Sequence, residues 1–227
     1  MAEVFKAVIG RLTGALGNMV FRNHEDVTTI TMRPRKYEVK MTEAIIQRRE
    51  RFALTGSFSM AINRDANLKY TWEKVYNKKK RIMTTIFKEN YKHITYNNIS
   101  NAATLAPPLG IGISKSASTL TGTDVSVTLE PIGTKTKINL SSEVSIYMTA
   151  LIYCKTPVIA TEDPFKFVNI TSSSIALSLT NPLTFEVELQ DTEMQIYDMY
   201  SEHTLFAAFF TLNDIGVPVN YTNTIKG

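Results

Sequence analysis

The chain has 227 residues, of which 44% are hydrophobic and 20% are charged. These proportions are typical of a globular protein and exclude disorder over most of the length. The single cysteine, Cys154, excludes an internal disulfide; it lies in an apolar run and is predicted to be a buried, inert thiol. No apolar run reaches the roughly 18 residues that a membrane-spanning helix needs, so we expect no membrane partner.

The net charge of +4 is unevenly distributed along the chain. Residues 1–100 contain 19 Lys/Arg and 9 Asp/Glu, whereas residues 101–227 contain 6 and 12. A basic first half is suited to contact nucleic acid or an acidic protein. Opposite charges in the two halves also favour head-to-tail stacking of identical subunits, which produces rings and tubes.

Residues 1–41 are predicted to form an N-terminal arm and a β-hairpin. Two short strands, at 18–21 and 27–32, flank a polar turn at 23–26. Proline ends the second strand at position 34, inside a basic cluster. This cluster is either a solvated turn or a contact for phosphate or carboxylate groups.

A basic helical hairpin is predicted over residues 42–96. The first helix should run from Thr42, a favourable N-cap, to about Asn63. The second should run from about 67 to 93, and the short connection between them makes the pair antiparallel. Trp72, the only tryptophan, is predicted to be a core anchor, with a platform for a nucleobase as the alternative.

Basic side chains form two runs on these helices. Three arginines within four positions of the first helix wrap around much of it, so at least one should point away from plain solvent. Residues 78–81 form a basic belt on the second helix and are predicted to join these arginines. Each run is either a solvated helix face or an electrostatic contact surface. The predicted interaction surface, for a protein partner or DNA, consists of Arg33, Arg35, Lys36, Arg48, Arg49, Arg51, Lys78, Lys79, Lys80 and Arg81.

Residues 97–112 are predicted to be a linker at a domain boundary, because their asparagines, prolines and glycines do not continue a helix. Residues 113–227 then show apolar residues at every second position, in about seven short segments separated by turn signals. This pattern is typical of an antiparallel, immunoglobulin-like β-sandwich. The predicted fold class is therefore α+β, with short strands and a helical hairpin ahead of the sandwich.

Residues with catalytic chemistry do not form a motif in this sequence. The three histidines, at 24, 93 and 203, lack metal-ligand spacing, and no nucleophile elbow is present. Glu186 and Glu188 share one strand face but are predicted to point to solvent. We therefore expect no enzymatic activity, no metal and no cofactor.

The stretch Gly14-Ala-Leu-Gly-Asn-Met-Val-Phe, the following strand, Arg33-Pro34 and the helix after Thr42 resemble a family of uncharacterised proteins. That family occurs in Bacteroidota and in the tailed phages that infect them, including crAss-like phages. The resemblance covers about residues 10–55, and Ile45-Ile46 departs from the family pattern. The matching positions are Gly17, Asn18, Pro34, Thr42, Glu43, Ala44, Gln47, Arg48, Arg51, Phe52 and Ala53. The resemblance implies a second helix, a β-sandwich and a multicopy virion component.

The sequence thus predicts a multicopy structural or assembly protein of a tailed-phage virion, either a head-to-tail connector ring or a capsid accessory protein. Its expected partners are further copies of itself and other virion proteins, with DNA as a further partner of the basic half. The first residues do not resemble a signal peptide, so we expect synthesis in the host cytoplasm and a final location in the virion. The alternatives are a nucleic-acid-binding protein that uses the basic helices and a bacterial surface or adhesion β-sandwich module.

Overall fold

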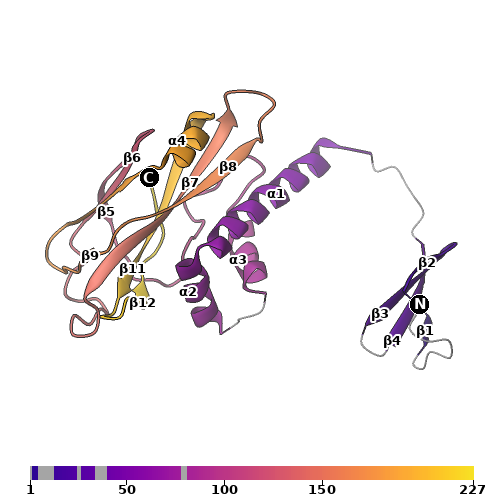
Figure 1. The fold of residues 1–227 in the computed structure, drawn as a ribbon, viewed down its shortest axis with the longest axis horizontal. Helices are drawn as coiled ribbons and strands as arrows, with labels where there is room; N and C mark the ends of the chain where they lie inside the picture. The colour runs from indigo at the N-terminus through magenta and orange to yellow at the C-terminus, as the bar shows by residue number, and fades with distance from the viewer. Residues whose placement is uncertain (1, 5–12, 25–26, 34–39, 78–80) are drawn as a thin grey trace. The chain divides into compact units, whose positions relative to one another are not determined.

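The computed structural model describes residues 2–4, 13–24, 27–33, 40–77 and 81–227. The chain divides into two compact units, Met1–Thr42 and Glu43–Gly227. Helices are combined with antiparallel sheets, which confirms the predicted α+β class (Figure 1).

The N-terminal unit is a four-stranded antiparallel sheet in the order β1-β4-β3-β2. Its strands are β1 (Ala2–Val4), β2 (Gly14–Leu16), β3 (Met19–His24) and β4 (Val27–Met32). The predicted hairpin is confirmed, because β3 pairs with β4 and Met19 lies opposite Met32. The tight turn between β2 and β3 requires a left-handed backbone, and Gly17 supplies it with φ of 56°.

The second unit begins with three helices. They are α1 (Glu43–Arg64), α2 (Ala66–Tyr76) and α3 (Ile82–Tyr91). The prediction for α1 is confirmed, but the single helix predicted over 67–93 is wrong. Asn77 adopts a left-handed conformation with φ of 49° and its N–H bonds to the carbonyl of Glu73, which ends α2. Asparagine tolerates this backbone better than most residues, so the apolar repeat on both sides of it belongs to two helices.

Two antiparallel sheets form the rest of this unit. The small sheet, in the order β10-β6-β5, consists of β5 (Lys115–Leu120), β6 (Asp124–Leu129) and β10 (Leu183–Glu188). The large sheet has the order β12-β11-β7-β8, with β9 paired to β7 and β13 paired to β11. Its strands are β7 (Ser145–Pro157), β8 (Phe165–Thr171), β9 (Ile175–Ala176), β11 (Tyr200–Leu212), β12 (Pro218–Tyr221) and β13 (Ile225–Lys226). A short helix, α4 (Asp191–Asp198), joins β10 to β11.

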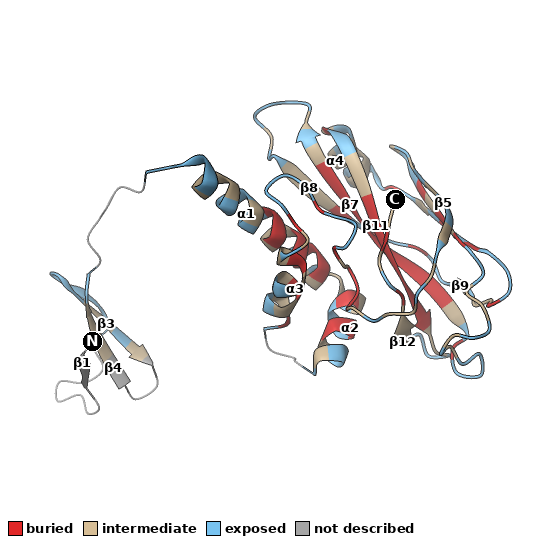
Figure 2. Ribbon diagram, turned by 180° about the vertical axis from the view of Figure 1, so that it is seen from behind, coloured by how far each residue is buried: buried red, intermediate tan, exposed pale blue. Residues whose placement is uncertain are grey.

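The large sheet is covered on both faces. Leu151 and Phe206 pack with the helices on one face, and their neighbours Ile152 and Leu205 pack with the small sheet on the other. Figure 2 shows the resulting buried stretch through the middle of β7 and β11. The two sheets are therefore one part of a helix–sheet–sheet arrangement, and an immunoglobulin-like topology is not confirmed.

The segment predicted as a linker, residues 97–112, belongs to the core of the second unit. Ala103, Leu105 and Ala106 are buried, and the indole Nε1 of Trp72 donates a 2.6 Å hydrogen bond to the carbonyl of Leu105. Asn90 fixes the same segment, because its side chain bonds both the N–H and the carbonyl of Thr104. The segment lacks regular structure yet joins the helices to the sheets, so the division of the chain falls after Thr42 instead. The prediction of Trp72 as a core anchor is confirmed.

Candidate interaction surface

The arginines of α1 differ in what they contact. Arg48 and Arg49 are exposed in the second turn, and within the described residues no hydrogen bond or ion pair holds either side chain. Arg51 is half-buried instead: its guanidinium lies 4.1 Å from the centre of the Tyr91 ring and donates a 2.6 Å hydrogen bond to the Tyr91 carbonyl. That carbonyl is at the C-terminal end of α3, where a helix carries partial negative charge. The expectation that at least one arginine points away from plain solvent is confirmed by Arg51.

Arg48 and Arg51 line one shallow pocket of about 340 Å³. The other lining residues come from α1, from the end of α3 and from the loop that follows α3: Ala44, Gln47, Tyr91, Thr95 and Tyr96. The contacts with Tyr91 hold the guanidinium of Arg51 in place. The pocket therefore has one ordered guanidinium, from Arg51, and one guanidinium, from Arg48, that is unpaired within the described residues. Guanidinium groups bind carboxylate and phosphate oxygens strongly, so this pocket suits an anionic group of a partner.

The other predicted residues are not gathered at this pocket. Arg81 is exposed and precedes α3, at the end of that helix opposite to Tyr91. The described part of the belt, Arg81, therefore does not join the α1 arginines as predicted. Arg33 is exposed in the N-terminal unit, where its backbone N–H bonds to the carbonyl of Asn18. Outside the described residues lie Arg35, Lys36, Lys78, Lys79 and Lys80.

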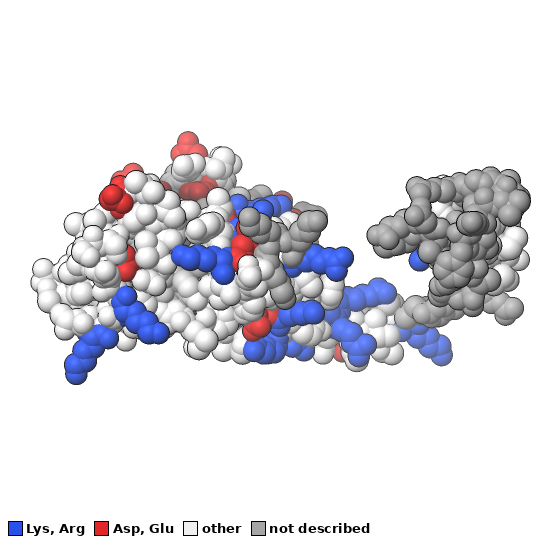
Figure 3. Space-filling model, turned by 90° about the horizontal axis from the view of Figure 1, so that it is seen from below, with Lys and Arg blue, Asp and Glu red and all other residues white. Residues whose placement is uncertain are grey.

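Charge separates the two outer layers of the second unit. The helical layer, residues 43–92, contains twelve Lys/Arg and five Asp/Glu, and Figure 3 shows Lys and Arg side chains gathered along the helices. The small sheet and α4 carry the opposite sign, with one lysine, Lys115, in residues 113–130 and 183–198. The acidic residues in these ranges are Asp124, Glu130, Glu186, Glu188, Asp191, Glu193 and Asp198. Since the large sheet lies between the two layers, one unit presents a basic side and an acidic side.

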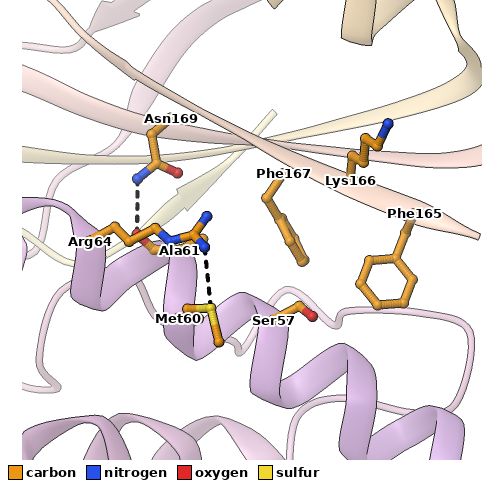
Figure 4. A pocket seen from close by; sticks show the side chains of 8 residues that line it. All are labelled: Ser57, Met60, Ala61, Arg64, Phe165, Lys166, Phe167 and Asn169. Atoms are coloured by element: carbon orange, nitrogen blue, oxygen red, sulfur yellow. Dashed lines mark hydrogen bonds between the residues drawn. The ribbon is translucent and has the colours of Figure 1, made fainter. Parts of the chain in front are cut away.

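A groove that the sequence reasoning missed lies between α1 and β8 (Figure 4). It has a volume of about 570 Å³. Its lining consists of Ser57, Met60, Ala61, Arg64, Phe165, Lys166, Phe167 and Asn169. Asn169 crosses from strand to helix with a 2.9 Å hydrogen bond from its amide to the Ala61 carbonyl. The residues are more than 100 positions apart, so no local pattern predicts the groove.

The floor of the groove is aromatic. Phe165 and Phe167 are half-buried, with ring centres 5.8 Å apart, and Phe167 lies 5.8 Å from the ring of the fully buried Phe58. A second hollow of about 450 Å³ shares Phe165 and continues along α1 past Ala53. One face of α1 and the length of β8 therefore border an extended depression. The one available sequence signal was the small side chains at every fourth position of α1, which leave room beside the helix.

The described part of the chain contains no cluster of three His, Cys, Asp or Glu that fits a metal ion. Glu186 and Glu188 are exposed, as predicted. His203 stacks on Tyr197 at 3.6 Å and is 2.9 Å from its carbonyl oxygen. No helix in the described residues combines the length and apolar character that a membrane span requires.

Cys154 is fully buried in the layer between the two sheets, as predicted, and burial raises the pKa of its thiol to about 12. An unfolded thiol ionises near pH 8.5. The buried neutral thiol therefore contributes its stability in full below about pH 8.5. Above pH 8.5 the unfolded chain loses a proton that the folded chain retains. The unfolding free energy then falls by about 1.4 kcal/mol per pH unit.

We therefore expect the unfolding free energy of the wild type to fall more steeply between about pH 9 and pH 10 than that of Cys154→Ala. Urea unfolding at a series of pH values measures this difference. Tyr153, whose pKa burial also raises to about 12, is present in both proteins and so contributes equally to the two pH profiles. Parallel pH profiles for the two proteins would contradict the assignment.

Comparisons with known proteins give no family for this chain. No protein-family model, no curated protein and no solved structure matches it.

Proposed function

We propose that this protein is a multicopy structural or assembly protein of a tailed-phage virion, acting as a connector-ring or capsid accessory subunit through contacts between copies. The observation that carries the proposal is the opposite charge of the two outer layers of the second unit. A basic helical layer and an acidic sheet layer on opposite sides of one subunit favour head-to-tail docking. They disfavour the docking of two like faces. The resemblance of residues 10–55 to phage and Bacteroidota proteins supports the virion setting.

The N-terminal sheet provides a second argument. None of the side chains described at residues 13–23 and 29–33 is buried, and Leu16 and Met32 are 67% and 72% exposed. A small sheet needs an apolar face covered by other groups to be stable in water. Contact with a neighbouring subunit would cover this apolar face. A protein that acts in many copies has such neighbouring subunits.

Reversal of the free arginines tests the proposal. We expect the wild type to have an oligomeric mass by light scattering at low salt. Arg48→Glu/Arg49→Glu should have a smaller mass, because attraction to the acidic layer becomes repulsion. Lys135→Glu/Lys137→Glu is the matched control: both lysines are exposed in the loop before β7, and the change in net charge is equal. A wild type that stays monomeric at all concentrations and with the other particle proteins would refute the proposal.

A DNA-binding function is the second candidate, because the guanidiniums of Arg48 and Arg49 are unpaired within the described residues. It predicts that wild-type protein binds duplex DNA with an affinity that falls steeply with salt, and that the arginine variant loses this binding. Fluorescence anisotropy with labelled DNA at two salt concentrations measures it. Salt-dependent binding by a stable monomer would favour this candidate over assembly.

A further inference from the structure

Three aromatic side chains lie in series where α1 and α3 pack together. The ring centres of Phe52 and Phe87 are 4.9 Å apart, and the rings of Phe87 and Tyr91 are stacked with their centres 5.5 Å apart. Phe87 and Tyr91 are half-buried, whereas Phe52, at the end of the series, is 61% exposed. Most of the Phe52 ring is therefore open to a further flat group.

Cationic groups flank this aromatic series at both ends. Arg48 and Arg49 precede Phe52 by four and three residues, so they are its neighbours on the surface of α1. The guanidiniums of Arg48 and Arg49 are unpaired within the described residues. At the other end, the guanidinium of Arg51 lies 4.1 Å from the centre of the Tyr91 ring. The surface thus combines flat rings with groups that bind phosphate oxygens strongly.

The acidic side chains of α1 and α3 have other contacts. The carboxylate of Glu43 accepts a 2.9 Å hydrogen bond from the amide of Gln47. The carboxylate of Glu89 is 3.6 Å from the ammonium of Lys92. Glu50 lines the separate hollow of about 450 Å³. Within the described residues, none of these carboxylates is paired with an arginine of α1, so an incoming anion displaces no acidic partner.

We propose that this face of α1 and α3 binds a single-stranded nucleic acid, with an unpaired base stacked on Phe52 and the adjacent phosphates bound by Arg48 and Arg49. Every base has a flat π-face, so stacking tolerates any base sequence while the arginines bind the charged backbone. This activity goes beyond the assembly function and does not depend on it.

The exposed ring favours a single strand over the two other anionic partners. A duplex keeps its bases stacked on each other, so a base step must be opened before a base covers Phe52. An acidic protein surface supplies negative charge without the series of flat groups. A single strand supplies both the phosphates and the free base faces that this surface can bind.

Substitutions of Phe52 test the stacking without a change in net charge. Fluorescence anisotropy of a labelled oligothymidylate measures the Kd for the full chain. We expect Phe52→Ala and Phe52→Leu to raise the Kd about fivefold to a hundredfold, the effect of losing one stacked base, and Phe52→Trp to bind at least as tightly as the wild type. Tyr70→Ala is the matched control, because Tyr70 is a 44% exposed ring on α2 outside the series, and it should bind as the wild type does.

The Phe52→Trp protein also gives a direct signal of stacking. Its new indole lies at an exposed position, whereas Trp72, the only tryptophan of the wild type, is fully buried. A base stacked on the new indole should quench its fluorescence, and the quenching should saturate at the same oligothymidylate concentration as the anisotropy.

The phosphate contacts are tested by salt. Arg48→Gln/Arg49→Gln should bind oligothymidylate more weakly than the wild type. The slope of log Kd against log salt concentration should also decrease, by about 0.7 for each phosphate contact that is lost. An unchanged slope would show that these arginines do not bind the strand, and would overturn their assigned role.

The remaining outcomes separate this inference from the proposed function. Tighter binding of the single strand than of a duplex of equal length, together with the loss in Phe52→Ala and Phe52→Leu, supports the contact. Equal binding of both forms with no effect of either substitution overturns it, because charge alone then accounts for the affinity. Polyglutamate binding that depends equally on Phe52 also overturns it, in favour of an acidic protein. No binding of the single strand at low salt refutes this inference and leaves the assembly function standing.

Discussion

Phe58→Ala should lower the unfolding free energy by about 3–5 kcal/mol, the range for removing a large buried aromatic ring. Phe58 is fully buried in α1 and lies 5.7 Å from the ring of Phe206 on β11 and 5.8 Å from that of Phe167 on β8. Its loss removes contacts between the helical layer and the large sheet. We expect one urea transition at a lower midpoint, with helical and aromatic circular dichroism signals lost together.

Phe52→Ala is the matched control, because Phe52 is on the same helix and is 61% exposed. Its ring centre lies 4.9 Å from that of a neighbouring ring, Phe87. We expect a loss of about 1 kcal/mol or less. Equal effects of the two substitutions, or two separate transitions in Phe58→Ala, would contradict a shared core for helices and sheets.

Glu143→Ala should destabilise the second unit by about 3 kcal/mol. The substitution removes a buried carboxylate that accepts hydrogen bonds and leaves the donors of those bonds unsatisfied. Glu143 is 2% exposed. Its carboxylate accepts hydrogen bonds from the hydroxyl of Thr211, the amide of Asn220 and the backbone N–H of Asn139. These bonds tie the loop before β7 to β11 and β12.

Glu143→Gln keeps the size of the side chain and one of its acceptor oxygens. We expect it to lose roughly half as much stability as Glu143→Ala, since some of the three donors keep a partner. Thermal unfolding of the wild type, Glu143→Gln and Glu143→Ala at neutral pH measures the order of their stabilities. A Glu143→Ala protein as stable as the wild type would show that these hydrogen bonds are not maintained in solution.

Local patterns predicted the elements whose causes are local. The apolar repeat after Thr42 gave the course of α1, and the strands around the polar turn gave the β3–β4 hairpin. The break at Asn77 was missed because the apolar repeat resumes after it, although asparagine next to a run of lysines is a possible helix end. Helix α4 was also missed, since residues 113–227 were predicted to contain only strands and turns. Its signal was Glu193 three residues after Gln190, which form a capping box.

The arrangement of layers depends on long-range contacts that period-two patterns do not specify. The predicted alternation over residues 113–227 indicated one buried face for each strand, and in β7 Ile146, Met148 and Ile152 form such a face, against the small sheet. The intervening Tyr147 and Leu151 are buried under the helices, which a period-two pattern does not indicate. A nearly unbroken apolar run was the available signal, because strands covered on both faces show such runs.

The candidate interaction surface was predicted in part for the same reason. Arg48, Arg49 and Arg51 follow each other on one helix, so their grouping could be read from the sequence. The contact of Arg51 with Tyr91 could not be predicted from the sequence, because it requires α3 to return beside α1. The groove between Arg64 and Lys166 requires the whole second unit to be folded.

The position of β11 in the large sheet has a consequence for synthesis of the chain. β11 lies next to β7 along its whole length, with Ala207 opposite Ala150, and it presents Phe206 to the helices. Because ribosomes make the chain from the N-terminus, the helices and β7 emerge well before the strand that completes their core. The apolar faces of α1 and β7 are then exposed on the nascent chain until residue 212 has left the ribosome. Folding of residues 43–227 is therefore expected to finish only after β11 has left the ribosome, with a need for chaperones that hold exposed apolar segments until then.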